Sequence, residues 1–126
     1  MESVIELKKE YFTYVEKIKN EYEVNRLHLI NDQCMDEAII EKIKRNVCEI
    51  FMTLFNATER KTKEVNGNIE YETFCQEYIK TFEKIPKSWR EKLEKDKKNQ
   101  FYDEVLKEES KLMVVELLKT KFLELM

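Results

Sequence analysis

The sequence predicts an all-α fold, an up-and-down bundle of four long helices with one short extra helix after Pro86. Apolar residues recur at steps of three and four along most of the chain, which is the period of one helix face. Glycine and proline occur once each, so few turns interrupt the helices. Apolar residues make up 42% and charged residues 39%, a balance typical of amphipathic helices. The 126 residues are enough for one core, so we expect a single domain over residues 1–126.

The first helix is expected over residues 3–28. Ser3 and Glu6 stand three residues apart at its start, the spacing of a capping box. A break is expected at residues 31–33. The second helix then begins with Asp36 as its acidic N-cap. Both helices carry apolar seams at alternating steps of three and four, with Val4, Leu7, Tyr11, Tyr14 and Ile18 in the first and Ile40, Ile43, Val47, Ile50 and Leu54 in the second.

The third helix is expected over residues 69–84, after a turn at Asn66-Gly67-Asn68. A short β-hairpin around Asn66-Gly67 is the alternative at that turn. Pro86 ends the third helix, because the residue before a proline is driven away from helical geometry. Ser88 and Glu91 form a second capping box, which opens the short extra helix.

The stretch between Leu93 and Phe101 contains no apolar residue. It either bends the chain near Asn99 or continues as a thinly buried helix. The last helix, from residue 100 to 126, is expected to be the spine of the bundle. Its apolar residues occupy an arc of roughly 120°, the width of a helix face buried against partners. That arc contains Val114, Val115, Leu118, Phe122, Leu125 and Met126.

The segment from Thr62 to Phe74 resembles the second half of the loop of a calcium-binding EF-hand. Gly67 stands where that family makes its sharp turn, and Ile69 stands where an aliphatic residue pairs with a partner loop. However, Thr62 and Thr73 replace the first ligand and the bidentate glutamate of the family. Without those carboxylates the loop lacks charge and oxygen ligands, so we expect an ordinary turn between helices and no metal.

Catalytic constellations are missing from the sequence. Cys48 and Cys75 fall on apolar helix faces and are expected in the core, whereas Cys34 falls in a loop. His28 is the only histidine, and it lacks the glutamate three residues earlier that a dinuclear metal centre in a bundle requires. A single glycine cannot form a phosphate-binding loop. The sequence therefore predicts a non-enzymatic protein without a cofactor.

Acidic residues near the start of the last helix are interleaved with lysines. Glu104, Glu108 and Glu109 alternate with Lys107 and Lys111, which predicts a solvated, salt-bridged face. The net charge of −3 gives no global attraction for nucleic acid or anionic membrane. No apolar run is long enough to cross a membrane, and no signal peptide is recognisable at the start. We expect a cytoplasmic location.

Basic residues gather between Lys84 and Lys98, with an excess of four positive charges. Trp89 could stack a base there while neighbouring cations contact phosphates. Contact with nucleic acid is therefore the alternative function. The residues that would bind it are Lys87, Arg90, Lys95, Lys97 and Lys98.

The helices carry more apolar surface than a four-helix monomer must bury, which usually marks an association surface. The leading prediction is a protein-protein interaction or regulatory module, acting as a homodimer or by binding a partner helix. Trp89, Tyr102 and Leu106 flank the polar stretch and are the expected contact residues.

Overall fold

The computed structural model describes residues 3–63 and 70–126. Within them the chain forms five α-helices, which confirms the all-α fold. They are α1 (Val4–Asn31), α2 (Met35–Thr62), α3 (Tyr71–Lys84), α4 (Lys87–Lys98) and α5 (Tyr102–Leu125).

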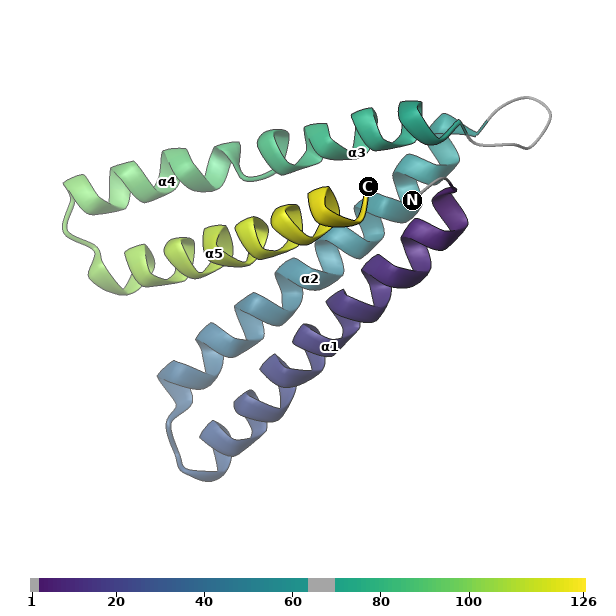
Figure 1. The fold of residues 1–126 in the computed structure, drawn as a ribbon. Helices are drawn as coiled ribbons and strands as arrows, with labels where there is room; N and C mark the ends of the chain where they lie inside the picture. The colour runs from purple at the N-terminus through teal and green to yellow at the C-terminus, as the bar shows by residue number, and fades with distance from the viewer. Residues whose placement is uncertain (1–2, 64–69) are drawn as a thin grey trace.

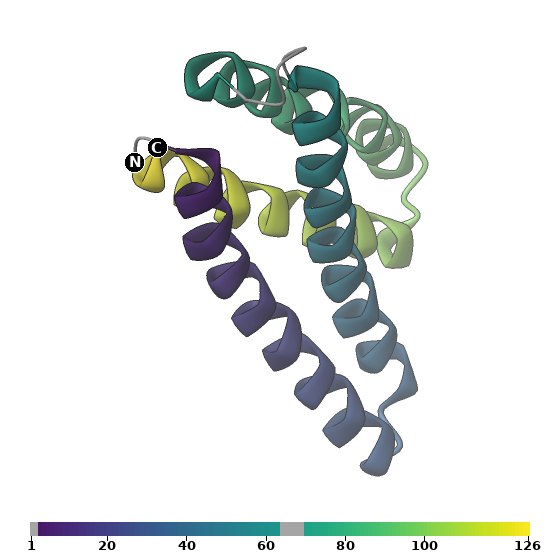
Figure 2. The same ribbon diagram turned by 90° about the vertical axis from the view of Figure 1, so that its right-hand side faces the viewer.

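Figure 1 shows the five helices arranged as two hairpins. The first hairpin is α1 packed antiparallel on α2. In the second, α3 and α4 follow one another almost in line, and α5 returns beneath them. The five helices therefore make four rods, which confirms the expected bundle with a short helix after Pro86. The two hairpins meet at one end, which we call the closed end, and diverge toward the other, the open end (Figures 1 and 2).

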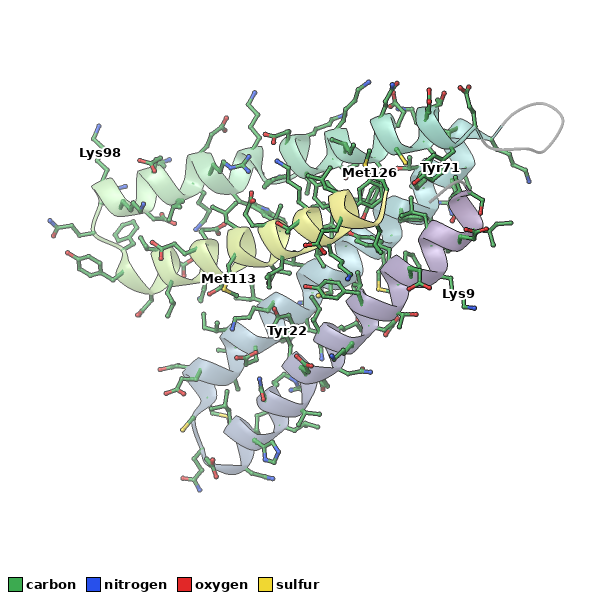
Figure 3. The ribbon with its side chains drawn as sticks, in the orientation of Figure 1. Lys9, Tyr22, Tyr71, Lys98, Met113 and Met126 are labelled. Carbon is green, nitrogen blue, oxygen red and sulfur yellow. The ribbon has the colours of Figure 1, made fainter. Side chains whose placement is uncertain are left out.

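The core lies at the closed end and is mainly aromatic. Phe55 has its ring centroid 4.6 Å from that of Phe74 and 5.1 Å from that of Tyr78. Phe122, from α5, lies 4.8 Å from Tyr78. Side chains from α1, α2, α3 and α5 therefore share one cluster (Figure 3). The expected spine is confirmed for its central residues, because Val114, Val115, Leu118 and Phe122 are fully buried.

A chain of hydroxyl hydrogen bonds crosses this core. The Tyr78 hydroxyl donates to the backbone carbonyl of Phe51, with an oxygen-oxygen distance of 2.8 Å. The Tyr11 hydroxyl lies 3.0 Å from that of Tyr78. Because Tyr78 uses its proton on Phe51, Tyr11 must be the donor of this second bond. Burial raises the pKa of both tyrosines above the usual value.

The observed N-cap agrees with the predicted one in α1 and differs from it in α2 and α4. The Ser3 hydroxyl accepts from the backbone N–H of Glu6 at 3.1 Å, as the predicted cap requires. The prediction that Asp36 is the N-cap of α2 is wrong, because Cys34 holds that position. The prediction that Ser88 caps α4 is also wrong, because α4 already begins at Lys87, with Pro86 before it. Pro86 is the N-cap of α4, with helical backbone angles and no side-chain cap hydrogen bond.

Two glutamines in the left-handed region make the tight turns at the open end. Gln33 has φ 62° and Gln100 has φ 61°. After each helix the same pair of backbone hydrogen bonds forms, as in the Schellman motif. In the α4–α5 turn the N–H of Phe101 donates to the carbonyl of Asp96 at 2.9 Å, and that of Gln100 to Lys97 at 3.2 Å. The polar stretch therefore reverses the chain instead of continuing as a helix.

The expected turn at Asn66-Gly67-Asn68 lies outside the described residues. So do the alternative hairpin and the centre of the segment that resembles an EF-hand loop. The described chain ends α2 at Thr62 and begins α3 at Tyr71.

Candidate partner-binding groove

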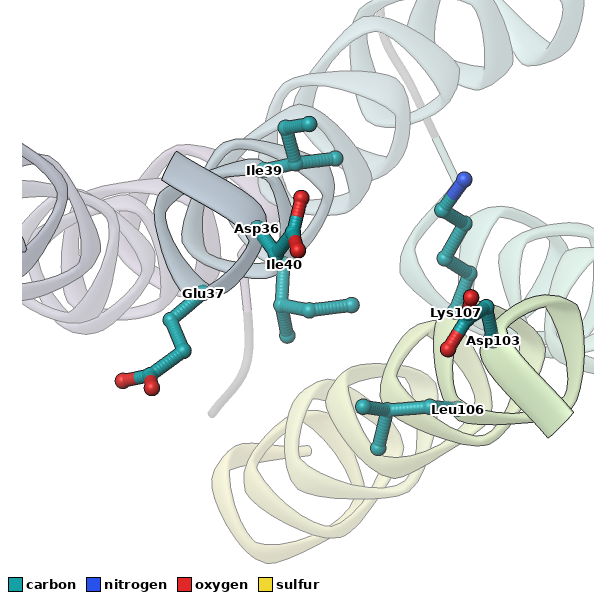
Figure 4. A pocket seen from close by; sticks show the side chains of 7 residues that line it. All are labelled: Asp36, Glu37, Ile39, Ile40, Asp103, Leu106 and Lys107. Atoms are coloured by element: carbon teal, nitrogen blue, oxygen red, sulfur yellow. The ribbon is translucent and has the colours of Figure 1, made fainter. Parts of the chain in front are cut away.

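The divergence of the two hairpins leaves a groove at the open end. It lies between the start of α2 and the start of α5 and has a volume of about 190 Å³. We call it the α2–α5 groove. Figure 4 shows the side chains that line it, which are Asp36, Glu37, Ile39, Ile40, Asp103, Leu106 and Lys107.

The walls of the groove are apolar. Ile40 of α2 and Leu106 of α5 point into the space between the two helices, and Ile39 lines its upper edge (Figure 4). Ile39 is 45% exposed and Leu106 is 54% exposed. In a bundle of parallel rods these side chains would cover one another. Here the helices have already separated, so each wall leaves branched aliphatic surface open to solvent.

The rim of the groove is acidic. Asp36, Glu37 and Asp103 contribute three carboxylates, and Lys107 contributes the one ammonium group among the lining residues. The Lys107 ammonium lies 3.1 Å from Glu104, so part of its charge is already paired. All three rim carboxylates stand in the first turn of α2 or α5, where they also stabilise the positive end of the helix dipole.

Apolar surface continues from the groove along α5. Leu106, Met113 and Leu117 stand seven and then four residues apart, which places them on one side of the helix. Met113 is 46% exposed and Leu117 is 40% exposed. Both border a shallow hollow that Tyr14 of α1 closes on its other side. The half-exposed apolar side of α5 therefore extends from the open end toward the closed end.

The three predicted contact residues do not lie on one surface. Tyr102 is exposed and begins α5, one helical turn before Leu106. Trp89 instead is half-buried, and the Lys111 ammonium of α5 lies 5.2 Å above the centre of its ring. The structure thus places Leu106 on the groove, Tyr102 one turn away at the start of α5, and Trp89 between α4 and α5. Sequence reasoning missed Ile40, because it counted this residue in the apolar seam of the second helix, and it assigned no role to Ile39.

The basic segment is divided between solvent and ion pairs. Lys87, Lys95, Lys97 and Lys98 are exposed on α4. Arg90 is half-buried, with Nη1 3.9 Å from a Glu83 carboxylate. Trp89 is turned inward under Lys111, so the stacking residue predicted for this segment does not face the same side as its exposed cations.

A network of ion pairs joins α4 to α5. The Lys92 ammonium lies 2.7 Å from Asp96, 3.2 Å from Glu104 and 3.6 Å from Glu108. Lys111 lies 3.1 Å from Glu108 on the other side. The hydrogen bond to Asp96 is the main cause that raises the pKa of Lys92.

Burial distinguishes the acidic members of this network. Asp96 and Glu108 are buried, whereas Glu104 is half-exposed. The predicted solvated face is therefore correct for Glu104 and wrong for Glu108, because α4 covers that part of α5. Since each buried carboxylate has an ammonium partner, the network fixes how the two helices pack and offers no free ligand.

A second ionic contact joins α1 to α2 nearer the first turn. The Glu23 carboxylate accepts hydrogen bonds from Arg26 on its own helix and from Arg45 on α2. The bond from Arg26 is the largest cause that lowers the pKa of Glu23 to about 2. Glu23 is thus held as a charged bridge between the arms of the first hairpin.

The nucleophile candidates lack activating surroundings. Cys48 is buried, and burial raises the pKa of its thiol to about 12. Burial also raises the pKa of Cys75. Cys34 is half-buried at the α1–α2 turn, with its sulfur 3.6 Å from the carbonyl of Asp32. His28 is exposed on the last turn of α1.

Further features of the described residues bear on ligands and membranes. Over residues 3–63 and 70–126, no three His, Cys, Asp or Glu side chains gather closely enough to hold a metal ion. No helix in these same two stretches combines the length and the apolar character needed to cross a bilayer.

Comparisons with protein families, with curated proteins and with solved structures found no match to this chain.

Proposed function

We propose that the chain is a non-enzymatic protein-interaction module that receives its partner in the α2–α5 groove. One observation carries the proposal: apolar side chains on both walls face the same opening and remain about half exposed. A soluble helical protein gains stability when such surface is covered. An apolar centre with a charged rim is also the usual composition of a protein-protein contact surface.

The chemistry around the groove supports contact over catalysis. Asp36, Glu37 and Asp103 stand at exposed helix starts, where no described neighbour desolvates them or pairs them with a nucleophile. General acid or base work needs a group poised near neutral pH and held against a reacting atom. The groove offers surface and charge, which are the requirements of recognition.

Contact with nucleic acid through α4 stays the alternative prediction. Its cations are present on the outer side of α4, but Trp89 lies on the inner side. The expected cytoplasmic location also stays a prediction.

A photo-crosslinking side chain at Leu106 tests the proposal inside cells of the native organism. The matched control carries the same group at Gln76, which is exposed on α3 and distant in sequence from both groove helices. We expect the groove position to form a defined adduct with a protein, either a second copy or another chain, and the control position to form none. Adducts of equal yield and composition at both positions would contradict the proposal.

A further inference from the structure

We propose that the occupant of the α2–α5 groove is the α4–α5 turn of a second copy of this chain, so that two V-shaped molecules interlock as a closed dimer. This inference rests on the proposed function and names its partner. The chain carries both halves of the contact at its open end, an aromatic turn with basic neighbours and an apolar groove with an acidic rim.

The inserting half is the turn between α4 and α5. Phe101 is 55% exposed and Tyr102 is 71% exposed, although aromatic side chains of this size usually cover apolar surface. Their backbone is held by the hydrogen bond from the Phe101 N–H to the Asp96 carbonyl. Two exposed aromatic rings on a fixed turn lose little conformational freedom when they dock, which favours binding.

Three lysines precede this aromatic turn on α4, and the carboxylates of Asp103 and Glu104 follow it on α5. Lys95, Lys97 and Lys98 occupy the last turn of α4 and are all exposed. Lys97 approaches Glu94 only to 4.0 Å, so its ion pair is weak. An aromatic turn with a positive border on its α4 side is therefore available for contact.

The receiving half is the groove itself. Ile39, Ile40 and Leu106 offer a branched aliphatic surface of the kind that packs against aromatic rings. The rim carries three carboxylates against the Lys107 ammonium, which is paired with Glu104. The turn is apolar with positive neighbours and the groove is apolar with negative ones. Each therefore supplies what the other lacks.

The two halves lie close enough to form one self-complementary patch. Tyr102 of the turn and Leu106 of the groove are one helical turn apart on α5. A twofold dimer requires that the same patch contain both complementary halves, because each copy then inserts into the other. The turn cannot fill its own groove, since Tyr102 of the turn and Leu106 of the groove are held one helical turn apart on α5. The contact therefore occurs twice in the dimer.

Complementation between two damaged variants tests this arrangement. The turn variant carries Phe101→Ser and Tyr102→Ser, and the groove variant carries Ile39→Ser and Leu106→Ser. All four side chains are at least 45% exposed, so the fold should survive, and circular dichroism checks that it does. The matched control is Leu123→Ser, since Leu123 is 45% exposed on α5 and does not line the groove.

Sedimentation velocity over a concentration series measures the dimer dissociation constant of each protein. We expect each double variant to dimerise about 100-fold more weakly than the wild type, because the dimer loses two contacts worth about tenfold each. The control should match the wild type. An equimolar mixture of the two variants should recover dimers about tenfold weaker than the wild type, because one intact turn meets one intact groove.

Several outcomes would overturn the inference. A wild-type chain that stays monomeric at millimolar concentration has no second copy in its groove. A mixture that associates no better than its components shows that turn and groove do not meet. If Leu106 meanwhile crosslinks to a different protein in cells, the interaction function stands and only the second copy is refuted. If Leu106 gives no specific adduct and the chain is monomeric, both proposals fail.

Discussion

The closed and open ends of this molecule share α1, α2 and α5, but their apolar residues differ in burial. At the closed end, aromatic side chains from α1, α2, α3 and α5 interlock and are fully buried. At the open end, Ile39 and Leu106 line the same groove from its two walls and remain about half exposed. The apolar pattern of a helix therefore determines which of its sides is apolar. The divergence of the two hairpins determines along which part of the helix that side is buried.

The largest contrast between the two ends is expected on truncation of one apolar side chain at each. Phe55→Ala should lower the free energy of unfolding by about 4 kcal/mol, because it leaves a cavity among four aromatic neighbours. Leu106→Ala should change it by no more than about 0.5 kcal/mol in the monomer, because half of that side chain is already solvated. Urea denaturation at low protein concentration measures both.

Should Phe55→Ala fail to fold, Phe55→Leu provides the same comparison at about 1 kcal/mol. Losses of equal size at Phe55 and Leu106 would show that the groove is closed in solution. The distinction between the two ends would then be lost.

A smaller effect should come from the hydroxyl chain at the closed end. Tyr78→Phe should cost about 2 kcal/mol, because it deprives the buried Tyr11 hydroxyl of its acceptor as well as losing the bond to Phe51. Tyr11→Phe should cost about 1 kcal/mol, because Tyr78 keeps its bond to the Phe51 carbonyl. The double variant should lose less than the sum, because it removes the unpaired hydroxyl. Thermal and urea unfolding test this, and strict additivity would refute the hydrogen bond between the two hydroxyls.

The smallest effects are expected at the open end, where both turns use glutamine at positive φ. Gln33→Gly and Gln100→Gly should each raise the free energy of unfolding by about 0.5 to 1 kcal/mol, since glycine adopts this conformation without a Cβ clash. The matched control, Gln76→Gly on the exposed side of α3, should lower it by about 1 kcal/mol. Denaturant midpoints distinguish the signs. A loss of stability at all three positions would show that the glutamine side chains themselves support the turns.

Local chemistry explains what the sequence could predict of the fold. The scarcity of glycine and proline and the seam spacing of apolar residues indicated four long helices and one short one. All five helices are present in the described chain. Ser3 capped its helix as predicted, because a hydroxyl acts on the nearest free N–H groups. Cys34 could not be predicted as a cap, because the turn made by Gln33 places it there and glutamine is not a usual turn residue.

The candidate site was less predictable, because it depends on how two hairpins cross. Tyr102 and Leu106 were chosen from the poorly covered polar stretch, and both border the groove or its neighbouring turn. Trp89 was chosen by the same reasoning, yet it packs under Lys111 because α4 folds back on α5. Glu108 is buried for the same reason. A helical period identifies the sides of a helix, but it does not tell which side another hairpin leaves open.

The interruption at Pro86 separates one rod into two parts with unequal anchorage. α3 contributes Phe74, Tyr78 and Phe82 to the aromatic cluster, whereas the apolar anchors of α4 are Trp89 at its start and Leu93 one turn later. Backbone amides in α4 should therefore exchange their hydrogens with solvent faster, through local opening. Those in α3 should exchange more slowly, because their exchange requires unfolding of the whole core. Because α4 ends at the aromatic turn, docking of that turn onto another molecule should be recorded first as slower exchange along α4.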